Sequence, residues 1–102
     1  MTQYRVTATV KEIRAKCPLY TLGDKIVFED FYAKSSKSED MCIHAFSAMS
    51  TLISALLHGR SAVDLGIGSE PDVGHIQCPD PGPPYTKGGT VVFELRRQII
   101  YE

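Results

Sequence analysis

A 20-residue stretch, DMCIHAFSAMSTLISALLHG at 40–59, constrains the fold of this chain more than any other segment. Its apolar residues recur at the spacing of one helical face, and no Asp, Glu, Lys or Arg follows its first residue. Asp40, or Ser38 just before it, can cap the first turn, and Gly59 can take the left-handed conformation that ends a helix. The stretch therefore predicts one long helix, the only substantial one in the chain.

The two faces of this helix differ in polarity. The inner arc is apolar and holds Leu52, Ala45, Leu56, Met49, Cys42, Ile53, Phe46 and Leu57. The outer arc is polar but uncharged, with Ser50, Ser54, Ser47, His58, Thr51 and His44. Because solvated faces usually carry charges, we expect a homo-oligomer that forms through the uncharged face of helix 41–58. A plain wetted Ser/Thr face is the alternative, and a membrane span is disfavoured because the run is short and rich in hydroxyls.

Strands are predicted at both ends of the chain. Apolar and polar residues alternate over 4–11, and the apolar phase shifts at Lys11-Glu12, as a β-bulge would produce. This strand is expected to end at Pro18. TVVFELRRQII at 90–100 repeats the alternation, while KIVFEDF at 25–31 and HIQC at 75–78 predict shorter strands. One helix among these strands indicates an α+β fold, a small, mostly antiparallel sheet with the helix packed on one face.

Length, composition and charge narrow the class of protein. A chain of 102 residues suits a single domain spanning 1–102. The net charge of -1 argues against a nucleic-acid binder. The N-terminus lacks an apolar run of signal-peptide length, and three cysteines are an odd number for a disulfide framework. We therefore expect a cytoplasmic protein with free thiols.

The three cysteines are the main candidates for chemistry. Cys17 and Cys78 each precede a proline where a strand gives way to a turn, and Cys42 opens the helix, where a thiolate is favoured by the helix dipole. We predict that they line one shared region as a candidate thiol site. The alternative is that each is an inert, buried small hydrophobe.

A soft metal is one possible occupant of such a site. Zinc or an iron–sulfur cluster usually takes four ligands, and His75, Asp80 and His44 are the candidates for the fourth. His75 and Cys78 would point to opposite faces of an extended HIQC segment. His44 would lie about 200° around a regular helix from Cys42, which disfavours a shared site.

The order of these motifs resembles a family of small uncharacterised prokaryotic proteins of about this length. The matching features are Cys17-Pro18 followed by Gly23-Asp24, Cys42 at the start of a helix, Cys78-Pro79-Asp80-Pro81, and a closing VVFEL strand. The chain departs from the family's pattern at Ile43 and His44, and in the segment after Gly59. The resemblance implies a single domain and draws attention to the cysteines, but implies no substrate.

Two functions follow as expectations. The first is a small cytoplasmic binding or accessory protein, homo-oligomeric, with three cysteines near one shared region. The second is a metal- or redox-dependent enzyme that uses Cys17, Cys42 and Cys78.

Overall fold

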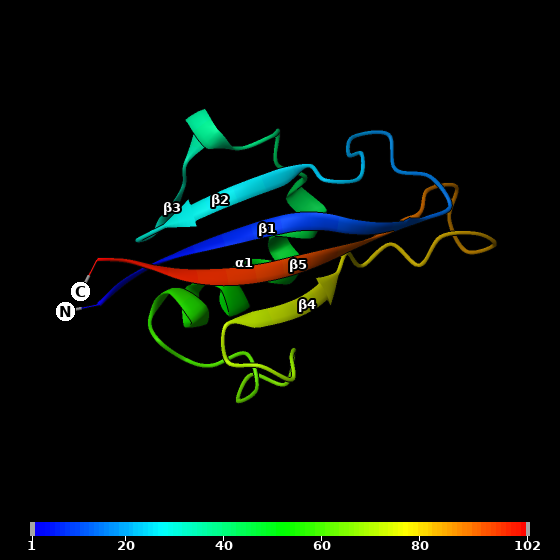
Figure 1. Ribbon diagram of the computed structural model, residues 1–102. Coiled ribbons are helices and arrows are strands. Elements are labelled where there is room, and N and C mark those ends of the chain that lie inside the picture. The colour runs from blue at the N-terminus through cyan, green and yellow to red at the C-terminus, as the bar shows by residue number, and fades with distance from the viewer. Residues whose placement is uncertain (1, 102) are drawn as a thin grey trace.

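The computed structural model describes residues 2–101 and confirms the α+β fold, with one α-helix and a five-stranded sheet. The sheet order is β3-β2-β1-β5-β4, and every neighbouring pair is antiparallel. The helix α1 lies behind this sheet in Figure 1 and covers one of its faces. The elements are β1 (Gln3–Arg14), β2 (Lys25–Glu29), β3 (Tyr32–Ala33), the 3-10 helix η1 (Ser35–Lys37), α1 (Ile43–Leu57), β4 (Val73–Gln77) and β5 (Thr90–Tyr101).

The two terminal strands form as their alternation predicted, and they pair with each other at the centre of the sheet. Their register shifts between Val10 and Glu12, which confirms the predicted bulge. The bulge returns Ile13 to the inner face, opposite Val91. The strand stops at Arg14 rather than continuing to Pro18, because Ala15 takes a left-handed φ of 67° and turns the chain away.

The core lies between the sheet and α1. The alternating inward residues of β1, β2 and β5 pack against the apolar arc of the helix. Fully buried members include Val6, Ala8, Ile26, Met49, Leu56, Phe93 and Leu95. The outward residues of β1 and β5 are mostly polar and at least partly exposed, whereas on β2 the outward Val27 and Glu29 are buried as well.

The helix begins later than the sequence predicted. Neither Asp40 nor Ser38 caps it; Cys42 occupies the N-cap position in an extended conformation, without a side-chain cap hydrogen bond. Ser38 instead bonds to β2, where its Oγ accepts the N–H of Val27 at 2.9 Å. The other end matches the prediction, because Gly59 has a φ of 96° and Arg60 N–H donates to Ala55 O at 3.0 Å.

The segment between α1 and β4 is irregular, with a turn over 62–66. Ala62 anchors it in the core, and Arg97 holds it from β5 through a side chain that is only 6% exposed. No described helix is long and apolar enough to cross a membrane.

Candidate thiol pocket

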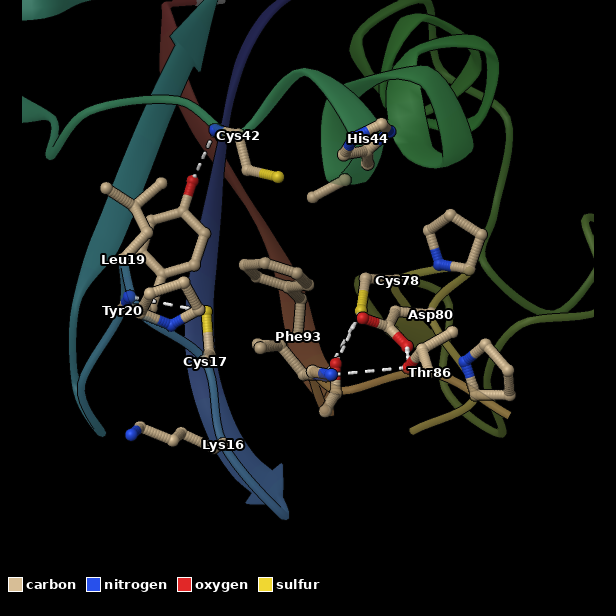
Figure 2. A pocket seen from close by; sticks show the side chains of 17 residues that line it. Lys16, Cys17, Leu19, Tyr20, Cys42, His44, Cys78, Asp80, Thr86 and Phe93 are labelled. Atoms are coloured by element: carbon tan, nitrogen blue, oxygen red, sulfur yellow. Dashed lines mark hydrogen bonds between the residues drawn. The ribbon is translucent and has the colours of Figure 1, made fainter. Parts of the chain in front are cut away.

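A cavity of about 540 Å³ lies between the turn that follows β1 and the start of α1. Its walls come from the turn after β1, the first turn of α1, the inner face of β5 and the loop 79–89. Figure 2 shows the three cysteines approaching it from three separate elements, with Phe93 drawn among them. The lining residues are mainly apolar, with Lys16, His44, Asp80 and Thr86 as the charged or polar side chains at its margin.

The three thiols are held differently. Cys17 is half-buried, and its Sγ accepts the N–H of Tyr20 at 3.4 Å. Cys78 is buried; its Sγ accepts the N–H of Val91 at 3.2 Å and its S–H donates to Gly89 O at 3.8 Å. Cys42 is half-buried, and within residues 2–101 no hydrogen bond reaches its sulfur. None of the three is in a disulfide; Cys17 and Cys42 are partly exposed, whereas Cys78 is covered.

Tyr20 joins two of the cysteine segments and was not singled out by the sequence analysis. Its hydroxyl accepts the backbone N–H of Cys42 at 2.8 Å, so it takes over the capping role that Asp40 was expected to play. Its ring meets Phe93 edge-on, with centroids 5.7 Å apart. Burial raises the pKa of this phenol; the hydrogen bond from the Cys42 N–H lowers it by less, and the nearby Cys42, Cys17 and Asp24 add smaller increases, so the hydroxyl stays protonated. The only feature of the sequence that could have pointed to Tyr20 is its position three residues after Cys17.

The loop 79–89 is built around Asp80. Its Oδ1 accepts the N–H of Gly82 at 2.8 Å and the hydroxyl of Thr86, while Thr90 Oγ1 donates to the Asp80 carbonyl at 2.5 Å. These bonds fold the loop back on itself and make it a wall of the cavity. Asp80 is therefore a turn residue that shapes the site.

The two histidines that were considered as metal ligands lie in different places. His75 lies on β4 opposite Glu94, on the face of the sheet away from the cavity, so it cannot serve as a ligand there. His44 lines the cavity beside Cys42. Cys42 is extended rather than helical, so both residues line the cavity, although within residues 2–101 they belong to no group of three metal-ligating side chains.

The residues do not fit a metal site. Within residues 2–101, no three Cys, His, Asp or Glu side chains lie close enough to share a metal ion. The donors instead surround a cavity wide enough for an organic molecule. Zinc and iron–sulfur clusters need their thiolates gathered at one point, and this arrangement spreads them apart.

The pKa of Asp80 offers a test of the loop. The Thr86 hydroxyl and then the Gly82 N–H hold the pKa of this carboxyl below its usual value. Because these bonds favour the ionised carboxylate, they stabilise the folded loop at pH values above the ordinary pKa of Asp. This stabilisation is lost as the pH falls through the lowered pKa of Asp80 in the folded protein. We expect Thr86→Val to move the carboxyl titration of Asp80, followed by carbon NMR, to higher pH. Thr86→Ser keeps the hydroxyl and should titrate like wild type; an unchanged midpoint in Thr86→Val would contradict this account.

Comparison with models of known protein families, with curated proteins and with solved structures finds no match. The resemblance based on the cysteine motifs therefore stays a prediction, and the function is argued from the geometry.

Proposed function

We propose that this protein binds a small organic molecule with an apolar body in the thiol pocket. The observation that carries the proposal is the cavity itself: about 540 Å³, with apolar walls and a few polar groups at the margin. Ligand sites in proteins have this size and composition, and they usually lie where several elements meet. The free thiols suit a reducing cytoplasm, where we expect the protein to work.

A binding protein fits this arrangement better than the metal- or redox-dependent enzyme. A metal enzyme would gather the three thiolates around one ion, and the cysteines instead lie on separate walls. Elemental analysis of protein purified without chelator tests the alternative directly. One equivalent of bound zinc or iron that is lost in the Cys42→Ser and Cys78→Ser variants would favour the enzyme.

Cys42 provides a matched pair of variants for the binding test. Cys42→Phe places a ring where the thiol lines the cavity, whereas Cys42→Ser leaves the volume nearly unchanged. We expect a neutral, environment-sensitive dye such as Nile red to bind wild type and Cys42→Ser, and to lose affinity about tenfold or more in Cys42→Phe, since a filled cavity excludes the dye.

Fluorescence titration measures the affinities, and circular dichroism checks that each variant is folded. Bound dye should also slow the alkylation of Cys17 and Cys42 by iodoacetamide, read out by mass spectrometry. Equal dye affinity in Cys42→Phe and Cys42→Ser, together with unprotected thiols, would place the dye elsewhere and remove the proposal.

We also propose that the protein self-associates through the uncharged face of α1. His44, Ser47, Thr51 and Ser54 are exposed on this face, and Phe46 beside them is 40% exposed. An uncharged face with an exposed aromatic ring suits contact with a second copy better than contact with water. We expect light scattering to give a dimer mass that Thr51→Glu converts to the monomer mass. Lys87→Glu, which reverses a charge on the loop 79–89, should leave the dimer intact, and a monomer at every concentration would contradict the expectation.

A further inference from the structure

The sheet face opposite α1 carries an excess of positive charge. The strand register turns five cationic side chains outward on this face, those of Arg5, Lys11, Arg14, Lys25 and Arg96. Lys34 and Lys37 adjoin it from the segment around η1, and the carboxylate residues Glu39 and Glu70 adjoin it near Lys25 and Arg96. On the strands themselves, five cations stand beside three carboxylates, those of Glu12, Glu29 and Glu94, whereas the whole chain has a net charge of -1. Charge is thus separated between the two sides of the molecule, which creates a field that attracts anions.

The positive charge is concentrated around a hollow of about 310 Å³. Arg5 comes from β1, Lys25 from β2 and Lys37 from η1, so three elements each contribute one cation. The remaining lining residues are Thr7, Val27 and Gln98, which add a hydroxyl and an amide as uncharged donors. The hollow therefore offers charged and neutral donors around one point, which is what a tetrahedral oxyanion requires.

Glu29 does not neutralise the three cations that line the hollow. Glu29 Oε2 lies 2.6 Å from Arg5 Nη2, and its Oε1 lies 3.9 Å from Lys34 Nζ. The Arg5 hydrogen bond, together with the nearby charges of Lys34 and Lys37, holds the pKa of Glu29 low, so it remains ionised. Within residues 2–101, no carboxylate lies within 4.0 Å of Lys25 or Lys37. Among these residues, neither lysine forms a close ion pair, although Glu29 lies near enough to Lys37 for the two charges to interact.

We propose that this hollow binds the phosphate group of a small phosphorylated molecule. The guanidinium of Arg5 and the ammonium groups of Lys25 and Lys37 would contact the phosphate oxygens, with Thr7 and Gln98 as neutral donors. The site lies on the sheet face away from the thiol pocket, so it is independent of the function proposed for that pocket.

Inorganic phosphate and pyrophosphate are the probes. We expect both to cause saturable shifts in the backbone amide NMR signals of Thr7 and its neighbours, with pyrophosphate binding more tightly. Lys25→Gln and Lys37→Gln should each weaken pyrophosphate binding about fivefold, the order expected for one wetted charge contact. Lys11→Gln is the matched control, because Lys11 lies on the same face but 3.8 Å from Glu94, outside the hollow.

Glu29→Gln tests the site in the opposite direction. Removal of this carboxylate frees Arg5 and should strengthen pyrophosphate binding. The proposal is overturned if the probes cause no saturable shifts, or if Lys11→Gln weakens binding as much as Lys25→Gln and Lys37→Gln. It is also overturned if a short single-stranded oligonucleotide binds more tightly than pyrophosphate and depends equally on every outward cation, since the whole face would then act as a diffuse polyanion surface.

Discussion

Replacing Arg97 with methionine is expected to lower the free energy of unfolding by about 3 kcal/mol, the cost of removing one member of a buried charged network. The guanidinium is 6% exposed and lies at the junction of three elements. Its Nη1 donates to Leu56 O at 2.9 Å and to Arg60 O at 2.6 Å, at the carboxyl end of α1. Its Nε donates to Asp72 Oδ1 at 3.0 Å. Methionine fills most of the volume but leaves these carbonyls without their donor.

The geometry also explains why a positive charge is tolerated here. The carboxyl end of a helix carries partial negative charge, and Arg97 meets it directly. The ring of Tyr4 covers the guanidinium carbon at 4.5 Å, which adds a cation–π contact. Arg97 thus connects β5 with the carboxyl end of α1 and with the segment before β4.

The neighbouring residue is a matched control. Arg96 points to the opposite, wetted face of the sheet and pairs with Glu94 at 3.2 Å. Urea unfolding of Arg96→Met should stay close to wild type, because exposed ion pairs contribute little. Equal losses in the two variants would show that the effect comes from charge removal in general and would contradict the assigned network.

The sequence predicted the sheet and the helix well because both depend on periodic patterns. Alternation along 4–11 and 90–97 needs only the pleat of a strand, and a shift in its phase can only be a bulge or an end. The ends of elements were predicted less well. Asp40 has the right side chain for a cap, yet Tyr20 supplies the capping contact from the turn after β1. No local pattern encodes a partner that is 22 residues away.

The candidate site, too, was predicted only in part from the sequence. All three cysteines do line one cavity, as their positions at element ends suggested. The sequence could not show that His44 also lines the cavity, because this depends on the extended backbone of Cys42 just before the helix. The role of the proline-rich loop 79–89 as a wall depends on hydrogen bonds within 80–90 that its composition cannot reveal.

The second large effect on stability is expected from a substitution in the loop 79–89. Gly89 crosses the end of β1 so closely that an added Cβ would lie 2.2 Å from Arg14 O and 2.4 Å from Lys16 N. Both are backbone atoms and cannot rotate away. Gly89→Ala must therefore push the loop away from β1, at a cost of about 3 kcal/mol in the free energy of unfolding, the upper end of the usual range for overpacking.

The same displacement should open the thiol pocket. Gly89 O accepts the S–H of Cys78, and Lys16 precedes Cys17, so moving the loop separates two walls of the cavity. We expect Gly89→Ala to lose Nile red binding and to make Cys78 react with iodoacetamide faster than in wild type, because the thiol loses its cover. Thermal unfolding and mass spectrometry of the alkylated protein measure the two effects.

Gly88→Ala separates a backbone clash from a side-chain clash. A Cβ there would lie 2.4 Å from Asp80 Oδ2, at the end of a side chain that can turn aside. We therefore expect Gly88→Ala to lose less stability than Gly89→Ala and to keep Cys78 protected. If the two variants behave alike, the contact of Gly89 with the end of β1 does not hold the wall in place. If only Gly89→Ala exposes Cys78, the cavity depends on a close approach that no side chain larger than hydrogen permits.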